Sequence, residues 1–252
     1  MIPNYISLIM ENNFKEKIKE FRQKFPIGIQ EGLVMLQLAN GDLNLAEDLF
    51  KEKTLHEILS KTEVQKEIAI AHLTKCNYDI YLTINSIDEE RYGFTERVLK
   101  KFNQDKFTGL KRIASEVERI ENILRNRDFF WFTIEHLSNL PPELYCLVLM
   151  MEWLNYEDYE GLDHAIHFHL DKVKFQINNQ LQLPHIAQTL QNAKTIYQEQ
   201  LEEQTIKSLK NGYLMPTPEF IEQEKLFVIQ KPLLVNSLYE FVTMHMDKFP
   251  TR

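Results

Sequence analysis

A chain of 252 residues with 44% hydrophobic and 26% charged residues is long enough for two globular domains. It contains seven glycines and nine prolines, and β-branched runs between turn signals are nearly absent, so we expect an all-α fold. No stretch reaches the roughly 18 apolar residues that span a bilayer, no secretory signal opens the sequence, and the two cysteines form no disulfide framework. We therefore expect a cytoplasmic protein that does not engage a membrane.

The net charge of −8 is unevenly distributed along the sequence. Residues 1–127 carry equal numbers of acidic and basic side chains, so the whole excess lies in residues 128–252. Part of it forms one dense cluster, made of Glu152, Glu157, Asp158, Glu160 and Asp163. An acidic surface repels nucleic acid, so we expect no direct nucleic-acid binding here and a basic protein as the electrostatic partner.

The first part of the chain has the spacing of short amphipathic helices. Pro26 and Gly28 end the first helix, and Asn40-Gly41-Asp42 ends the second and caps the third. The pattern predicts helices over residues 14–24, 29–39 and 43–50.

A second copy of this pattern follows along the chain. An alignment without gaps at an offset of 35 residues pairs Leu33 with Ile68 and Leu38 with Leu73, and places Asn77 on Asp42. An internal repeat of this kind indicates two small units that stabilise each other by packing together.

Residues 18–53 contain an ordered set of short motifs: Ile18-Lys19-Glu20-Phe21-Arg22, Gly28, Ala39-Asn40-Gly41-Asp42-Leu43, Ala46 and Leu49. In these residues the stretch resembles the amino-terminal domain of elongation factor Ts. The first loop departs from the family, because a Phe-Pro-Ile-Gly sequence replaces its threonine–glycine-rich turn. The resemblance implies a UBA-like three-helix fold that docks a protein, with the first loop and the end of the third helix as the partner surface. The corresponding residues here are Phe25, Pro26, Ile27, Gly28 and Phe50, of which we expect Phe25 and Ile27 to be exposed.

These patterns divide the chain into a tandem UBA-like region (1–88), connecting helices (89–127) and a larger acidic helical domain (128–252). In the connecting region we expect Gly109 to separate two helices. In the acidic domain Pro142 begins an apolar helix, which we expect to be buried at the centre. Two final helices are expected over residues 219–229 and 233–248.

The acidic domain contains a second set of matching residues: Leu140-Pro141, Ile177 to Leu181, Ala187, Leu190, Ala193 to Tyr197, Tyr239 to Val242, His245 and Phe249. In these residues it resembles a bacterial family of DNA-mimic proteins, which are acidic and all-helical. The family's asparagine–glycine–glycine–phenylalanine turn is replaced here by the sequence from Leu154 to Tyr159, which has no glycine pair. The resemblance implies a helical fold and a decoy that binds a DNA-binding protein.

The sequence offers few candidates for catalysis. His164 and His167 share a helix face, being three residues apart, and Asp163 or Glu160 could join them. A zinc site needs four ligands or three and a water, so these two histidines are weak candidates. Neither of the glycine-rich phosphate-binding motifs GxxxxGK[ST] and GxGxxG is present, and Cys146 lies in an apolar helix that disfavours a thiolate. We expect no cofactor.

We therefore interpret the chain as a non-enzymatic protein-interaction or regulatory protein that uses two surfaces. The first is the loop and helix end given above for the UBA-like pair. The second is an acidic patch with interleaved aromatic residues, which suits a basic partner: Trp153, Tyr156, Glu157, Asp158, Tyr159, Glu160 and Asp163. The alternatives are a DNA-mimic decoy and a metal-dependent enzyme using the region of His164 and His167.

Overall fold

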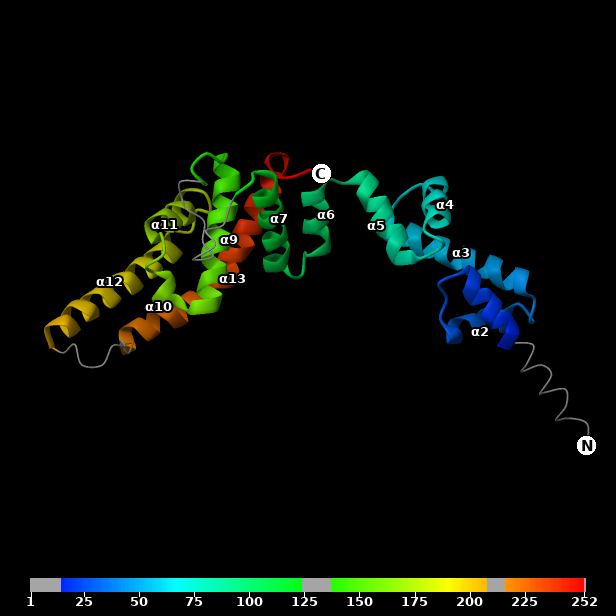
Figure 1. The fold of residues 1–252 in the computed structure, drawn as a ribbon, viewed down its shortest axis with the longest axis horizontal. Helices are drawn as coiled ribbons and strands as arrows, with labels where there is room; N and C mark the ends of the chain where they lie inside the picture. Colours follow the sequence, from blue (N-terminus) through cyan, green and yellow to red (C-terminus); the bar gives the residue numbers. More distant parts are fainter. Residues whose placement is uncertain (1–14, 124–136, 208–215, 252) are drawn as a thin grey trace, which may run out of the picture. The chain divides into compact units, whose positions relative to one another are not determined.

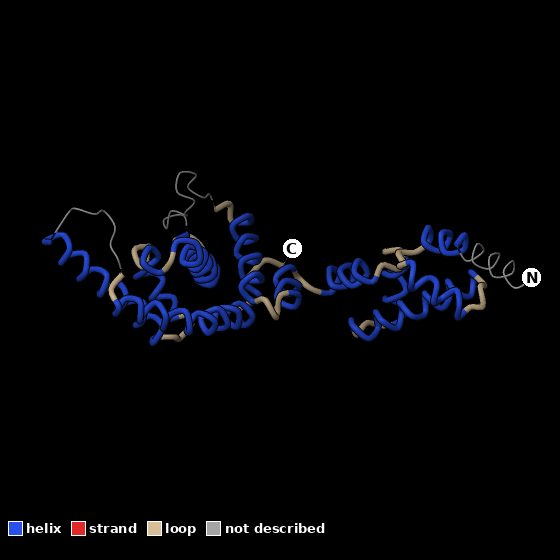
Figure 2. The backbone as a smooth tube through the Cα atoms, turned by 90° about the horizontal axis from the view of Figure 1, so that it is seen from below, coloured by secondary structure: helices blue, strands red, loops and turns tan. Residues whose placement is uncertain are grey.

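The computed structural model describes residues 15–123, 137–207 and 216–251. Every regular element in these ranges is a helix, so the predicted all-α fold is confirmed (Figure 1 and Figure 2). The chain forms two compact units, residues 1–92 and 93–252. Across the described ranges no helix is both long enough and apolar enough to cross a bilayer. The expected start of the acidic domain at Asp128 lies outside the described residues.

The first unit consists of five described helices. The first covers residues 15–24, and it is followed by α2 (Ile29–Leu38), α3 (Leu43–Thr62), α4 (Lys66–Lys75) and α5 (Ile80–Arg91). The sequence pattern predicted a short helix over 43–50, but α3 continues for 20 residues. No glycine or proline interrupts residues 43–62, so nothing in the backbone ends the helix earlier.

The unit is a duplication with a period of 37 residues, in which α3 serves both copies. Residues 15–51 form the first repeat and residues 52–91 the second, so the second half of α3 takes the place of the helix over 15–24. The offset of 35 expected from the sequence is wrong by two residues. At 37, structurally equivalent residues are buried in pairs: Phe21 and Ile58, Leu36 and Leu73, Ala46 and Thr83, Phe50 and Ile87.

The turn between the second and third helices of each repeat confirms this register. The Gly41 N–H donates to the Leu36 carbonyl at 2.7 Å, and the Tyr78 N–H donates to the Leu73 carbonyl at the same distance. An aspartate then caps the next helix in both repeats, Asp42 for α3 and Asp79 for α5. The Asp42 carboxylate accepts the Asn44 and Leu45 N–H groups and the Asp79 carboxylate accepts the Leu82 N–H, donors that a helix start leaves unpaired.

Each repeat has a small apolar core of its own. The first is built around three phenylalanines: Phe21 packs edge-on against Phe25 and Phe50, with ring centroids 5.7 and 5.9 Å apart. The second is built from Ile58, Leu73 and other aliphatic side chains. Tyr78 packs against both cores, so it joins the two repeats.

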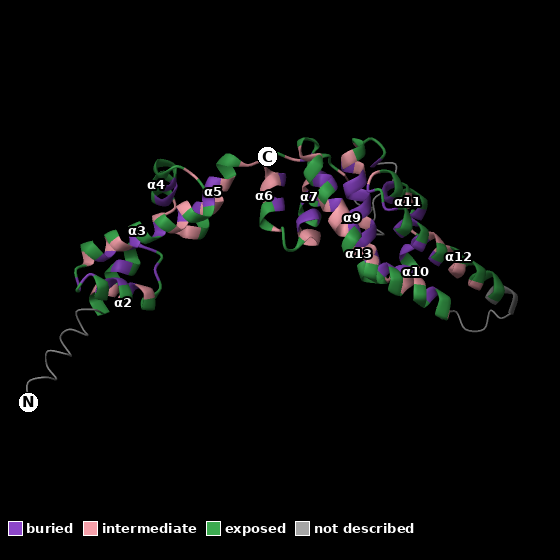
Figure 3. Cartoon of the chain, turned by 180° about the vertical axis from the view of Figure 1, so that it is seen from behind, coloured by how far each residue is buried: buried purple, intermediate pink, exposed green. Residues whose placement is uncertain are grey.

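The second unit contains seven described helices and a short 3₁₀ turn. They are α6 (Phe94–Lys101), α7 (Lys106–Ile120), α9 (Pro142–Glu160), α10 (Leu162–Ala165), α11 (Leu170–Asn179), α12 (Pro184–Lys207), α13 (Pro218–Met244) and η1 (Met246–Lys248). As predicted, α9 begins at a proline and is buried along most of its length (Figure 3). It packs against α7, α10, α11 and α13, which makes it the centre of this unit's core.

Two helices that the sequence assigned to a connector, α6 and α7, pack into this core. The break between them falls at residues 102–105, whereas the sequence pattern placed it at Gly109. Gly109 lies inside α7, where a Cβ atom would come within 2.9 Å of the Phe102 Cβ, so its role is close packing.

The division of the chain at residues 92 and 93 also redistributes the charge. The first unit has 11 basic and 15 acidic residues, and the second has 18 and 22. Each unit therefore carries four of the eight excess negative charges. A division at residue 127 places the whole acidic excess in the C-terminal part, whereas the division into compact units shares it equally.

The last long helix, α13, runs without interruption through Pro232. The sequence predicted two helices here, with a gap at residues 230–232 that contains this proline. Proline disfavours a continuous helix, since it removes a backbone donor and crowds the carbonyl four residues earlier. The helix continues because it buries large side chains on both sides of the proline, Phe227 before it and Leu234 and Leu238 after it.

Residues 250 and 251 cap the N-terminus of α6. The Phe94 and Thr95 N–H groups donate to the carbonyls of Thr251 and Pro250, both at 3.1 Å. The Thr95 hydroxyl also donates to the Pro250 carbonyl, at 2.7 Å. Backbone carbonyls thus pair the donors that the first turn of a helix leaves free.

Candidate functional site

The first predicted partner surface is largely core. Phe25, Ile27 and Phe50 are 7, 4 and 3% exposed and belong to the phenylalanine cluster of the first repeat. The prediction that Phe25 and Ile27 are exposed is therefore wrong. Pro26 and Gly28 are exposed, but Pro26 lies between the buried Phe25 and Ile27, and Gly28 has no side chain to offer a partner. The physical reason is that a three-helix unit of this size needs its loop side chains to fill its core.

The aromatic residues of the second predicted surface face inward to different degrees. Trp153 is buried, its Nε1 donates to the Ala165 carbonyl at 2.9 Å, and its ring packs edge-on against Phe227. Tyr156 is half-buried, with its ring 5.0 Å from that of Phe168. In contrast, Tyr159 is 85% exposed. One of the three aromatic residues is thus available on the surface.

Two of the acids in this cluster are paired internally with Lys231 of α13. The Lys231 ammonium bonds both the Glu157 and the Asp158 carboxylates. Burial raises the pKa of Glu157 above its usual range, although Lys231 opposes this shift. Burial lowers the pKa of Lys231, but its hydrogen bonds to Asp158 and Glu157 outweigh burial and raise it overall. Glu160 remains on the surface.

The two candidate metal ligands do not share a helix. The helix on which both histidines were expected is broken after α10, and the chain turns at His169, which has a left-handed φ of 46°. The Nδ1 of His164 lies 3.2 Å from the Asp163 carboxylate, whereas His167 packs edge-on against Tyr197. In the described parts of the chain, no three His, Cys, Asp or Glu side chains are grouped as a metal site would need.

The second unit does contain a groove that the sequence did not indicate. We call it the α13 groove. It has a volume of about 680 Å³ and is lined by Asn103, Gln104, Asp105, Lys106, Phe107, Asp158, Val228, Lys231, Pro232, Val235 and Asn236. These residues come from the α6–α7 turn and the start of α7, from the end of α9, and from the middle of α13.

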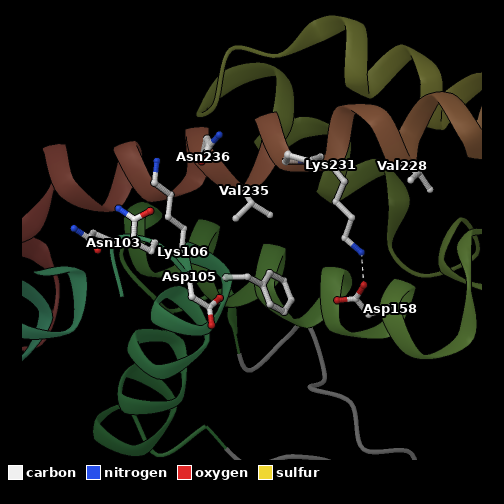
Figure 4. A pocket seen from close by; sticks show the side chains of 11 residues that line it. Asn103, Asp105, Lys106, Asp158, Val228, Lys231, Val235 and Asn236 are labelled. Atoms are coloured by element: carbon white, nitrogen blue, oxygen red, sulfur yellow. Dashed lines mark hydrogen bonds and ion pairs between the residues drawn. The ribbon is translucent and has the colours of Figure 1, made fainter. Parts of the chain in front are cut away.

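The α13 groove is apolar in the middle and charged at both ends. Figure 4 shows Lys106 and Asn103 at one end, the Lys231–Asp158 ion pair at the other, and Val235 between them. The Lys106 ammonium lies 5.0 Å from the centre of the Tyr239 ring, a cation–π contact that holds this lysine at the groove. The lining carries two lysines and two aspartates, so it is balanced in charge.

An exposed apolar stripe lies beside the groove on the same helix. Leu226, Ile229 and Leu233 recur at helical spacing and are 40, 76 and 45% exposed. We call these three residues the α13 ridge. By helical periodicity they lie away from the buried Phe227 and next to Pro232 and Asn236 of the groove. Helix α13 is therefore apolar around most of its circumference, although only part of it is covered.

One further constellation, in the first unit, contains the residue types of a catalytic triad. His72 is buried, with its Nδ1 3.0 Å from the Ser86 hydroxyl and its Nε2 3.1 Å from the Glu90 carboxylate. In serine hydrolases the acid bonds Nδ1 and the nucleophile bonds Nε2, which is the reverse of this arrangement. Ser86 also lies inside α5, where backbone N–H groups bond within the helix and none is free to stabilise an oxyanion. The geometry suits a tie between α4 and α5.

Sequence reasoning missed the α13 groove because its three segments are far apart in the chain. A weak signal was present at Leu226, Ile229 and Leu233, whose spacing adds a second apolar stripe to that of the buried residues. Splitting the helix at Pro232 hid this pattern.

Comparison with known proteins relates the chain to a family. The family model described as the YfbN C-terminal domain matches residues 93–247, which lie within the second unit and begin at its first residue. The protein described as uncharacterized protein YfbN, from Escherichia coli (strain K12), is 30% identical to this chain over 240 residues. The match covers 94% of this chain and 95% of that protein. No solved structure matches the chain.

Proposed function

The chain belongs to the YfbN family, and from this premise we propose that it is a non-enzymatic protein that binds a protein partner through the α13 groove and ridge. The observation that carries the proposal is the exposure of the α13 ridge on a helix that is otherwise packed into the core. Contiguous exposed apolar surface beside a groove is typical of interaction sites.

The chemistry around the groove defines the partner. Val228, Pro232 and Val235 offer an apolar floor, and the ridge extends it with larger side chains. Asp158 lines the groove at the end of α9, and the exposed Tyr159 and Glu160 follow it in the sequence. The end of a helix also carries partial negative charge. A segment with apolar residues on one face and basic residues at one end would complement this surface.

Site-specific cross-linking would test this proposal in cells. A photoreactive amino acid at Ile229 of the ridge should cross-link to one discrete protein. The same amino acid at Glu240, which is exposed on the same helix about three turns further on, is the matched control and should not cross-link. Identical cross-linking at both positions, or none at Ile229, would overturn the proposed site.

The first unit adds a second part to the proposal. The resemblance of residues 18–53 to the elongation factor Ts domain supports a docking role for the repeats, although the loop residues Phe25 and Ile27 are buried. Leu45 and Leu82 occupy equivalent positions in the two repeats and are 47 and 52% exposed. We propose that any docking by this unit uses such exposed side chains instead of the loop.

A further inference from the structure

The second unit presents another groove, on a surface with a different chemistry. It lies on the α6–α7 hairpin, has a volume of about 530 Å³, and is lined by Phe94, Val98, Thr108, Lys111, Arg112, Ser115, Glu116 and Arg119. We call it the basic groove. Its lining shares no residue with the α13 groove.

The hairpin that carries the basic groove is positively charged within an acidic protein. Residues 93–120 contain seven basic and four acidic side chains, whereas the whole chain has a net charge of −8. The groove itself is lined by three cations and one carboxylate. A locally positive surface attracts anionic partners and disfavours cationic ones.

The cations of the groove lie on one side of α7. Lys111, Arg112 and Arg119 share this side of the helix, with the Ser115 hydroxyl between Arg112 and Arg119 and the Thr108 hydroxyl one turn before Arg112. The Arg112 guanidinium lies over the Phe102 ring, 4.7 Å from its centre, which fixes that side chain before a partner arrives. No carboxylate within the described residues is paired with Lys111 or Arg112.

Arg119 differs from the other two cations. It forms a bidentate pair with Glu116, at 2.9 and 2.6 Å, and this pair lowers the pKa of Glu116. The hydrogen bonds that Arg119 donates thus keep Glu116, the one carboxylate that lines the groove, ionised and paired. Lys111 and Arg112 are left as the cations that can bond an incoming anion.

The floor of the groove argues for a folded partner segment. Phe94 is half-buried and Val98 is 8% exposed, so an apolar strip lies beneath the row of cations. Single-stranded nucleic acid is typically bound by cations together with exposed aromatic rings on which the bases stack, but Arg112 covers the nearby Phe102 ring. An amphipathic helix presents both apolar and charged side chains along one edge and fits a groove between helices.

We propose that the basic groove docks an acidic amphipathic helix of a partner protein, with its apolar side chains against Phe94 and Val98 and its carboxylates against Lys111 and Arg112. This second docking surface stands on observations that are independent of the α13 groove. It would let one chain engage an acidic segment and a basic segment at separate places.

Fluorescence polarisation with the full-length protein and a designed probe would test the proposal. The probe is a labelled helical peptide of leucine, alanine and glutamate, with leucines at positions i, i+3 and i+7 and glutamates on the flanking positions. We expect binding that weakens about tenfold or more in the Lys111→Glu/Arg112→Glu variant, since two attractive pairs become repulsive. Lys172→Glu/Lys225→Glu is the control with the same charge change at exposed lysines outside the groove, and should bind like the wild type.

Three comparisons separate this inference from its alternatives. A peptide of the same composition with its leucines scattered around the helix should bind at least several-fold more weakly, because it cannot cover the floor. Equal binding by the two peptides, or equal loss in the control variant, would mean non-specific charge attraction and overturn the proposal.

Tighter binding of a single-stranded oligonucleotide than of the probe would identify nucleic acid as the ligand instead. Concentration-dependent self-association that Lys111→Glu/Arg112→Glu abolishes would identify a second copy of the chain as the occupant. Circular dichroism of each variant confirms that it is folded.

Discussion

Asn40 and Asn77 lie 37 residues apart and adopt the same left-handed backbone conformation, with φ angles of 50° and 52°. Each follows the end of a helix, α2 or α4, and precedes a second residue of positive φ, which is Gly41 in the first repeat and Tyr78 in the second. Asparagine and glycine tolerate this conformation better than other residues do. The two repeats therefore share a backbone turn, although a different residue occupies its second position in each.

The first prediction concerns this turn. Gly41 has a φ of 80°, so Gly41→Ala should destabilise the first unit by about 1 kcal/mol, because a Cβ disfavours that conformation. Asn40→Gly, at the neighbouring left-handed position, is the matched control and should leave stability nearly unchanged. Urea denaturation followed by far-ultraviolet circular dichroism would measure both. An equal loss in the two variants would contradict the proposed role of Gly41.

The second prediction follows from the sharing of α3 between the repeats. Phe21→Ala and Ile58→Ala remove equivalent buried side chains from the two cores, and each should cost about 2–5 kcal/mol. Because α3 runs through both repeats, either change should unfold the whole first unit in one transition. Both tryptophans lie in residues 93–252, so their fluorescence reports the second unit alone and should not change in the first transition. Two separate transitions within residues 1–92 would refute this coupling.

The third prediction concerns the bonds between α6 and residues 250 and 251. Thr95 is buried and its hydroxyl donates to the Pro250 carbonyl, so Thr95→Val should destabilise the second unit by about 1 kcal/mol. Thr95→Ser retains the hydroxyl and should recover part of the loss. Tryptophan fluorescence during urea denaturation gives the comparison. If Thr95→Ser is no more stable than Thr95→Val, the hydrogen bond contributes nothing.

The fourth prediction concerns Lys231, which bonds Glu157 and Asp158. Lys231→Met should destabilise the second unit by about 1–2 kcal/mol at neutral pH, since it leaves the nine-tenths buried Glu157 without its cation. Burial already raises the pKa of Glu157, and losing Lys231 would raise it further. A raised pKa means that the folded state binds the proton more tightly, so stability is retained below the unfolded pKa of about 4.3 and lost as pH rises through the folded pKa. The cost of Lys231→Met should therefore shrink near pH 4.

A double variant checks the origin of that effect. Adding Glu157→Gln to Lys231→Met removes the buried charge, and should recover part of the stability at neutral pH. The stability of the double variant should also lose the pH dependence that the single variant shows, because the titrating carboxyl is gone. A pH dependence that persists in the double variant would assign it to another group.

The fifth prediction separates the two cysteines by their reactivity. Cys146 is fully buried, and burial raises its pKa to about 12. Cys76 is half-exposed at the end of α4. A thiol reagent should thus modify one cysteine per folded chain and two after denaturation. Mass spectrometry of the labelled peptides should place the first label on Cys76, and early labelling of Cys146 would contradict the burial of α9.

Much of this fold could be predicted from residues that act locally. Pro142 begins α9 where the sequence indicated, and Asp42 caps α3. The buried α9 was evident from its composition, because a helix that is apolar all round is normally buried. These features depend on the backbone or on one element, so no knowledge of neighbouring helices is required.

Other features depend on contacts between distant parts of the chain, and the sequence alone gave the wrong answer. Pro232 does not end α13, because the core contacts of the helix outweigh the lost hydrogen bond. The repeat offset of 35 matched apolar positions, but the pairing of Asn40 and Asp42 with Asn77 and Asp79 at 37 would have identified the correct register. Phe25 was expected at a surface because it flanks a proline, whereas the fold places it in the core of the first repeat.

The candidate site was the least predictable part. Lys106, Asp158 and Lys231 line one groove from three helices, and no spacing in the sequence relates them. The acidic cluster was visible as a run of carboxylates, but the pairing of two of its members with Lys231 depends on how α9 packs against α13. Charge runs can be counted in a sequence, whereas their neutralisation requires the fold.

The central claim is that the α13 groove and ridge bind a protein partner, and an affinity titration tests it most directly. The partner captured by cross-linking at Ile229 would be titrated against the wild type, Ile229→Glu and the control Glu240→Lys, with circular dichroism confirming that each is folded. We predict that Ile229→Glu weakens binding about tenfold or more, because a charge replaces apolar contact area, while Glu240→Lys binds within about twofold of the wild type. Equal affinities for the wild type and Ile229→Glu would contradict the account.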